Sequence, residues 1–238
     1  ITGYDVRACL SADQECLDPV RVSDLKVLST TLKDDFVLGS SYYVEVSAIN
    51  VAGTSAYSDP SNEVVPRKAP DAPTAAKAVV NNTGGIALSW TAPANNGAAI
   101  TDYLVQACTS GKCDIVEDGL NDSTSTTLSG LTVGTSYTFI VAAVNAAGTG
   151  QYSDPSEVVT PRMLPSAPTQ VSALADKLGN IDVTWTAPNA NGATITDYVI
   201  QSCAAKVCTT FEDGTSTATS VQVTELPLGV AVTFQVAA

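Results

Sequence analysis

The amino-acid sequence predicts an all-β fold made of β-sandwich units in tandem. The motif Trp-Thr-Ala-Pro occurs twice, at Trp90 and at Trp185, and the two copies lie 95 residues apart. A repeat of this length is a whole small domain rather than one unit of a solenoid. Apolar residues also alternate along the chain, as in Ile86, Leu88 and Trp90, which is the period of a strand with one buried face. The chain is therefore predicted to be an array of similar domains.

Seven strands are predicted in the complete middle repeat, near residues 73–80, 85–91, 100–108, 112–117, 123–129, 135–145 and 151–160. Turn-forming residues separate them at 81–85, 94–97, 118–119 and 148–150. The resulting spacing of roughly 8–12 residues is typical of an all-β sandwich. The second strand alternates through Trp90, and the sixth alternates through Tyr137, Phe139, Val141 and Ala143. No window has the apolar spacing of a helix, so almost no helix is expected.

A specific set of residues marks the middle repeat: Pro73, Trp90, Ile100, Tyr103, Leu131, Gly134, Tyr137 and the run 144–156. With these residues the repeat resembles a fibronectin type III domain. The resemblance implies seven-stranded, immunoglobulin-like β-sandwiches arranged in tandem as a rod. It places Tyr137 at a tyrosine corner, where the hydroxyl bonds to upstream backbone, and Tyr42 at the same place in the first repeat. Val232 stands there in the third repeat, which therefore loses the hydroxyl bond.

Four aromatic side chains are predicted to anchor the cores: Trp90, Trp185, Tyr42 and Tyr137. Each tryptophan is in phase with the apolar residues of its own strand, so both indoles are expected to pack between the two sheets of their domains.

The repeat divides the chain into one complete and two partial domains. Residues 1–67 are predicted to be a partial domain without its first two strands, because Ile1–Tyr4 matches Ile100–Tyr103 at the start of the third strand. Residues 68–162 are the complete domain, and residues 163–238 lack the end of the sixth strand and the seventh. We expect the missing strands to belong to a longer chain, and strands donated by another subunit are the alternative.

Two proline-rich segments, Pro66–Pro73 and Pro161–Pro168, join the predicted domains. Proline fixes φ and favours extended backbone, so both linkers are expected to be short and semi-rigid. The first and last strands of the resembled fold leave from opposite poles, which implies domains stacked end to end.

The six cysteines fall into three pairs at equivalent places: Cys9 and Cys16, Cys108 and Cys113, and Cys203 and Cys208. Each pair flanks the predicted turn between the third and fourth strands, where opposite residues are close enough for a disulfide. A disulfide in each domain is favoured, and free thiols or a metal site are the alternatives. A structural zinc site needs four ligands, but each domain has two sulfurs and the chain has no histidine. Disulfides indicate an oxidising, extracellular or cell-surface location.

Charge and composition exclude several classes of function. The net charge of −13 argues against nucleic acid and anionic lipid as partners, because an acidic surface repels phosphate. No long apolar run predicts a membrane span. The absence of histidine excludes Ser-His-Asp, Cys-His and His-Glu-x-x-His arrangements, and without a glycine-rich nucleotide loop no cofactor is expected. Three acidic pairs are interpreted as turn residues rather than catalytic carboxylates: Asp34-Asp35, Glu117-Asp118 and Glu212-Asp213.

Asn81 and Asn121 each begin an Asn-x-Ser/Thr sequence within a predicted turn. Both are candidate N-glycosylation sites for a chain that passes through a eukaryotic secretory pathway. Unmodified turns are the alternative interpretation.

These observations favour a non-enzymatic extracellular array that acts as a semi-rigid spacer or adhesion module in a cell-surface or filament protein. Two alternatives remain, a spacer of a secreted carbohydrate-active enzyme and a receptor-like ectodomain that binds a protein ligand. The expected partners are neighbouring domains of the same chain, other subunits of an extracellular assembly, or cell-surface ligands.

Overall fold

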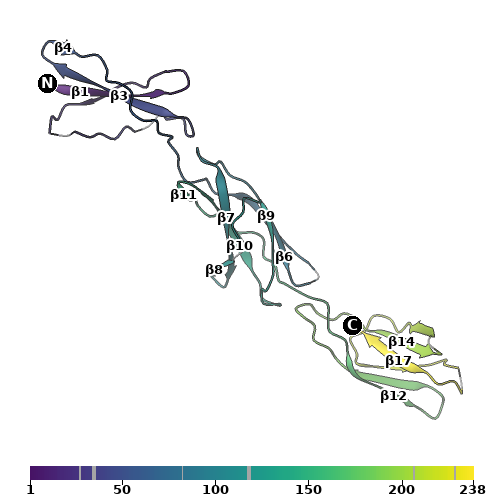
Figure 1. Cartoon of the computed structure of the whole chain (residues 1–238). Coiled ribbons are helices and arrows are strands. Elements are labelled where there is room, and N and C mark those ends of the chain that lie inside the picture. The colour runs from purple at the N-terminus through teal and green to yellow at the C-terminus, as the bar shows by residue number, and fades with distance from the viewer. Residues whose placement is uncertain (27, 34–35, 82, 117–118, 206, 228) are drawn as a thin grey trace.

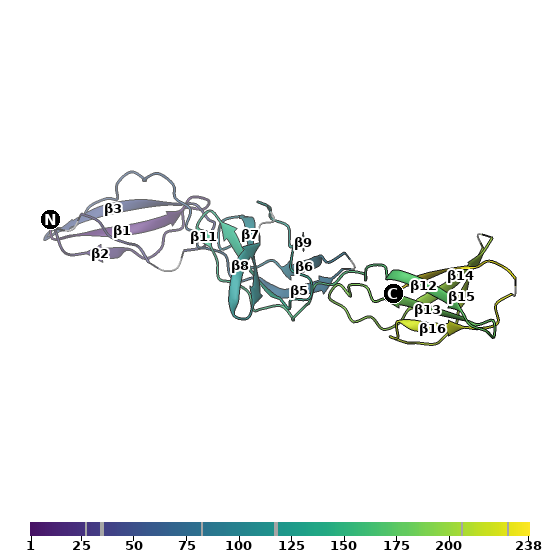
Figure 2. The ribbon, with the colours of Figure 1, turned by 90° about the horizontal axis from the view of Figure 1, so that it is seen from below.

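A computed structural model describes residues 1–26, 28–33, 36–81, 83–116, 119–205, 207–227 and 229–238. The regular structure of these residues is entirely β-strand, without a helix among them, which confirms the predicted all-β class. Figures 1 and 2 show three groups of strands that follow one another along an elongated molecule.

The middle group is a two-sheet sandwich. One sheet contains β5 (Thr74–Val80), β6 (Ile86–Thr91) and β9 (Ser125–Leu128), in that order. The other contains β7 (Ile100–Thr109), β8 (Lys112–Val116), β10 (Thr138–Asn145) and β11 (Gly148–Thr149), in the order β11-β10-β7-β8. Six of the seven predicted strands are therefore present with small shifts at their ends, although residue 117 lies outside the described residues.

The core of the middle group lies between these sheets. Trp90 from β6 packs against Tyr103 from β7, with ring centroids 5.1 Å apart. Phe139 and Val141 of β10 are fully buried in the same cluster. The apolar residues that alternate in the sequence are the ones that face the core, because successive side chains of a strand point to opposite faces.

The predicted seventh strand at residues 151–160 is wrong. Beyond the two-residue β11, only Val159 forms an isolated bridge, to Tyr137. The segment instead contacts β10 at every third residue. The backbone amides of Gly150, Ser153, Ser156 and Val159 donate to carbonyls of β10 and of the preceding Tyr137 at 2.8–2.9 Å. A period of three is that of a polyproline II helix, and Pro155 in the middle of the segment has no amide hydrogen for a ladder.

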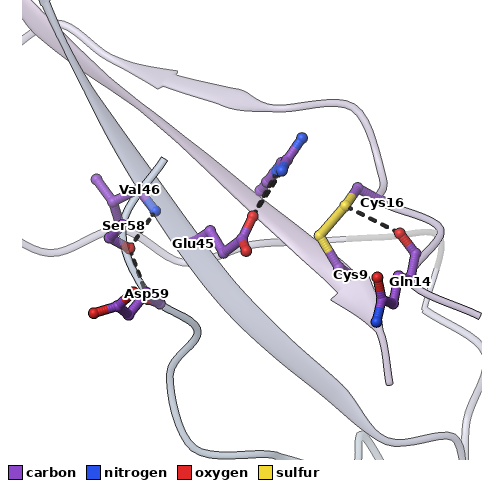
Figure 3. Close-up of polar contacts among 8 residues, drawn as sticks. Cys9, Gln14, Cys16, Glu45, Val46, Ser58 and Asp59 are labelled. Atoms are coloured by element: carbon purple, nitrogen blue, oxygen red, sulfur yellow. Dashed lines mark hydrogen bonds and ion pairs between the residues drawn. A yellow bond between two sulfur atoms is a disulfide. The ribbon is translucent and has the colours of Figure 1, made fainter. Parts of the chain in front are cut away.

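Serine hydroxyls complete the pairing of this segment. The Oγ atoms of Ser153 and Ser156 accept from the amides of Val141 and Phe139, at 3.1 and 3.0 Å. In the first group Ser55, Ser58 and Ser61 make the same bonds to β3 (Tyr42–Asn50), and Figure 3 shows Ser58 between Val46 and Asp59. We call these five residues the serine ladder.

The first group contains one sheet. Its strands are β1 (Gly3–Leu10), β2 (Val20–Val22), β3 and β4 (Gly53–Thr54), in the order β2-β1-β3-β4. Residues 28–33, where the repeat places a counterpart of β9, form no strand. The reason is that β9 pairs with β6 alone, and residues 1–67 contain no counterpart of β6.

The third group is again a two-sheet sandwich. Its sheets are formed by β12 (Thr169–Ala175), β13 (Ile181–Thr186) and β16 (Ser220–Val223), and by β15 (Val207–Phe211), β14 (Val199–Ala204) and β17 (Thr233–Ala237). Phe234 and Val236 are only half-buried, whereas their counterparts Phe139 and Val141 are fully buried. Residues 163–238 contain no counterpart of the serine ladder to cover β17.

Candidate functional site

The three cysteine pairs lie at equivalent hairpins and are joined in the structure. The Sγ atoms are 2.03 Å apart in Cys9–Cys16, 2.04 Å in Cys108–Cys113 and 2.07 Å in Cys203–Cys208, and the Cα atoms are 3.9–4.0 Å apart. Figure 3 shows the first bridge beside the loop that contains Gln14. All cysteines of the chain form disulfides, and none is free.

The middle bridge lies on the outer side of its sheet. Cys108 and Cys113 are opposite each other in β7 and β8. Their neighbours Val105 and Ala107 are buried in the core, but Cys108 is half-buried and Cys113 is exposed. The bridge therefore ties a hairpin at the surface and does not link the two sheets.

The aromatic anchors occupy equivalent positions in their groups. Trp90 and Trp185 are each 6% exposed. Each indole meets a tyrosine edge-on at 5.1 Å: Tyr103 of the facing sheet for Trp90, and Tyr198, which directly precedes β14, for Trp185. Burial raises the pKa of Tyr103 above its usual value, which fits a phenol enclosed by the core.

The tyrosine corner has the same geometry in two groups. The Tyr42 hydroxyl accepts from the Val37 amide at 2.9 Å, and the Tyr137 hydroxyl accepts from the Thr132 amide at 3.2 Å. Tyr42 is buried and Tyr137 is half-buried. Val232 has no hydroxyl to make this bond in the third group.

The candidate glycosylation residues lie in turns that they help to form. Asn81 Oδ1 accepts from the amides of Thr83 and Gly85 at 3.0 and 2.8 Å. Asn121 Oδ1 accepts from the Ser123 amide at 3.0 Å. Both asparagines are half-buried. Residue 82, within the first Asn-x-Thr sequence, lies outside the described residues.

Asp176 is the counterpart of Asn81 in the third group, a relationship that the sequence reading missed although the offset is the same 95 residues. Its carboxylate accepts from the Leu178 and Asn180 amides at 2.8 Å and from the Asn180 side chain at 2.9 Å. Donation by the Asn180 side chain is the largest effect and lowers the pKa of Asp176, while burial opposes it. Asp176 therefore caps the hairpin between β12 and β13.

Only one of the three acidic pairs lies among the described residues. Asp34-Asp35 and Glu117-Asp118 lie outside the described residues, and Glu212 and Asp213 are exposed. Within the described ranges, no cluster of three or more His, Cys, Asp or Glu side chains is placed to hold a metal ion. The same described residues include no helix that is both long enough and apolar enough to span a membrane.

The contacts at the first junction join the linker to a loop of the middle group. The Lys68 amide donates to the Asn96 carbonyl at 2.9 Å, and the Asn96 side chain donates to the Ala69 carbonyl at 2.9 Å. The Asn145 side chain, at the end of β10, donates to the Lys68 and Asn95 carbonyls at 2.8 and 2.7 Å. This linker was predicted to be a semi-rigid spacer, and its hydrogen bonds to the middle group were not predicted.

The second junction repeats the contacts to the loop. The Met163 amide donates to the Asn191 carbonyl at 2.9 Å, and the Asn191 side chain donates to the Leu164 carbonyl at 2.8 Å. Met163, Leu164 and Asn191 are each 95 residues beyond Lys68, Ala69 and Asn96. The two junctions therefore follow one plan.

The family of the middle group is decided by a direct match. Residues 71–159 match the family described as Fibronectin type III domain. These residues are a fibronectin type III domain. The bridged hairpin recurs in both flanking groups, the tyrosine corner in the first and the core tryptophan in the third, so both flanking groups share features with this domain.

Three relatives contain comparable regions. The chain is 30% identical over 162 residues to Fibronectin type III domain-containing protein 1 of Margaritifera margaritifera, which covers 68% of this chain and 21% of that protein. It is 28% identical over 168 residues to Phosphatidylinositol phosphatase PTPRQ of Homo sapiens, covering 69% and 7%. It is 30% identical over 169 residues to Cell adhesion molecule Dscam1 of Drosophila melanogaster, covering 68% and 8%. The chain thus spans about a fifth or less of the length of these relatives.

Proposed function

We propose that this fibronectin type III array is a non-enzymatic spacer in an extracellular or cell-surface protein. It holds whatever lies beyond its two ends at a set separation. In this proposal residues 1–67, 68–162 and 163–238 are successive domains.

The bonded linkers are the observation that carries the proposal. Each linker leaves one domain at its far end and enters the next domain at its near end. The domains therefore follow one another instead of folding back (Figures 1 and 2). The hydrogen bonds of Lys68 and Met163 to Asn96 and Asn191 hold each linker against a loop of the domain that it enters. A chain with these junctions transmits position from one end to the other, which is the task of a spacer.

Two observations support the extracellular location. A disulfide in every domain suits an oxidising compartment and is uncommon in a reducing one. One relative is described as a cell adhesion molecule. Adhesion through the loops of the array, to a cell-surface ligand or another subunit, is part of the same proposal.

Small-angle X-ray scattering of the purified chain tests the spacer role. An elongated, skewed distribution of interatomic distances is expected, and a compact distribution would contradict it. Assays on glycoside, ester and peptide substrates test the non-enzymatic part, with turnover above the buffer background as the contradicting result.

We also propose that Asn81 and Asn121 are acceptors of N-glycans in a eukaryotic secretory host. Intact mass before and after enzymatic deglycosylation measures occupancy. Thr83→Ala and Ser123→Ala remove each acceptor sequence while keeping its asparagine, so an unchanged mass in these variants would refute the assignment.

A further inference from the structure

We infer that an Asn-Gly pair in the middle domain and another in the third domain each form a fixed joint with the domain before, so that successive domains keep one relative orientation. The pairs are Asn96-Gly97 and Asn191-Gly192, and we call each of them the joint pair. This inference deepens the proposed spacer role and rests on it. It assigns an interaction surface between the poles of adjacent domains, whose partner is the next domain of the same kind.

The glycine of the joint pair lies directly on a hydrogen bond of the preceding domain. In the first domain the Gly39 amide donates to the Pro66 carbonyl at 2.9 Å. A Cβ on Gly97 would lie 2.5 Å from that amide nitrogen and 2.8 Å from that carbonyl oxygen. No side chain fits there, because real Cβ atoms do not approach backbone atoms so closely.

The second junction has the same arrangement. The Gly134 amide donates to the Pro161 carbonyl at 2.9 Å. A Cβ on Gly192 would lie 2.9 Å from that oxygen, 3.0 Å from that nitrogen and 2.7 Å from a methyl carbon of Val133. Gly97 and Gly192 also have φ values of +89° and +83°, which favour glycine independently.

The asparagine of the joint pair binds the backbone of the linker through its own carbonyl and its side-chain amide. Asn96 and Asn191 have φ values of 53° and 48°, a conformation that asparagine tolerates better than most residues. In this conformation each offers its carbonyl to one linker amide and its side-chain amide to the next carbonyl. The linker side chains differ between the junctions, Lys68 and Ala69 against Met163 and Leu164, yet these two bonds to the linker backbone recur. At the first junction the Asn96 side chain also donates to the Asp71 carboxylate at 2.9 Å.

The contact depends on the following domain and is not internal to the preceding one. A Cβ on Gly39 would meet the Cα of Gly97 at 3.2 Å, and one on Gly134 would meet the Cα of Gly192 at 3.8 Å. Gly229 is the counterpart of these residues in the third domain, and a Cβ there meets no described atom within 4 Å. The joint is therefore made only where two domains meet.

Residual dipolar couplings on the full chain test the joint. In the wild type, couplings from the middle and third domains should fit one common alignment tensor, as for a rigid body. In Gly192→Ala, the added methyl separates the domains, and each domain should then need its own tensor. The couplings within each domain should still fit its own structure, which distinguishes a loosened joint from an unfolded domain.

Gly130→Ala is the matched control. Gly130 has a φ of +76°, but a Cβ there meets no described atom within 4 Å, so this variant has the backbone strain without the contact. It should keep the common tensor. Separate tensors in the wild type, or a common tensor in Gly192→Ala, would overturn the joint. Elongated scattering with separate tensors would leave the spacer proposal standing, whereas compact scattering would defeat the spacer itself.

Discussion

The hydroxyl of Ser153 accepts a hydrogen bond from the amide of Val141 at 3.1 Å, while the Ser153 amide donates to the carbonyl of Val141 at 2.8 Å. One serine therefore satisfies both backbone groups of a β10 residue, as a neighbouring strand would. The hydroxyl also donates to the Asp154 carbonyl at 2.8 Å, so its own hydrogen is used. This geometry explains how a segment with a three-residue period covers the buried edge of β10.

Ser153→Ala should destabilise the middle domain by about 1–3 kcal/mol, because it leaves the buried Val141 amide without an acceptor. Ser153 is 7% exposed, so water has little access to replace the hydroxyl. Urea unfolding measures the loss. The exposed Ser129→Ala is the control and should change stability little; equal stability of the two variants would count against the serine ladder.

Removing the bridge with Cys108→Ser and Cys113→Ser together should leave the middle domain folded and lower its stability by about 2 kcal/mol, the chain-entropy value for so short a loop. Alkylation followed by mass measurement checks the bridges themselves. The untreated chain should take up no label, and the reduced, unfolded chain should take up label at all six cysteines. Labelling without reductant would show that the pairs are thiols.

Trp90→Ala should cost about 3–5 kcal/mol, because it leaves a large cavity between the sheets of the middle domain. Trp90→Phe keeps an aromatic ring against Tyr103 and should cost less. Circular dichroism during urea unfolding measures both without depending on the removed fluorophore. A loss in Trp90→Ala no larger than in Trp90→Phe would contradict its role as the core anchor.

The hairpin between β12 and β13 should weaken in acid. The Asn180 side chain lowers the pKa of Asp176 in the folded state, so the carboxylate contributes stability that is complete above its unfolded pKa. That stability is lost as the pH falls through the lower folded pKa. The chemical shift of the Leu178 amide reports the titration, and its midpoint should lie below that of Asp in an unfolded peptide.

Asp176→Asn provides the matched comparison, because Asn81 already occupies this place in the middle domain. The variant should keep the turn and abolish the acid response of the Leu178 amide. A midpoint at or above the peptide value in the wild type would exclude the hydrogen-bonded carboxylate.

The sequence predicted those parts of the fold that depend on a repeating local pattern. Alternation located β6 and β10, and the position of each cysteine pair across a turn located the bridged hairpins. It failed at 151–160 because pairing there occurs at every third residue through serine hydroxyls. The signal was present as Ser55, Ser58 and Ser61 in the first domain, but a search for a period of two does not detect it.

The role of the joint pair could not be predicted from neighbouring residues in the sequence, for a different reason. Gly39 and Gly97 are far apart in sequence and come from different domains, so neither one reveals the other. Ala94–Gly97 was interpreted as a turn, and the structure agrees, but the identity of the glycine is also determined by the backbone of the preceding domain. Such constraints become visible only when the two domains are placed together.

The position of the disulfides has a mechanical consequence. An unfolded chain extends by at most about 3.3–3.6 Å per residue. A disulfide shortens the extended chain only by the residues between its two cysteines. The bridges here join cysteines separated by 5 or 7 residues, so a domain pulled from its two poles would release nearly its full contour length with the bridge intact. The oxidised array can therefore lengthen under tension almost as far as a reduced one, with only the short bridged loops kept closed.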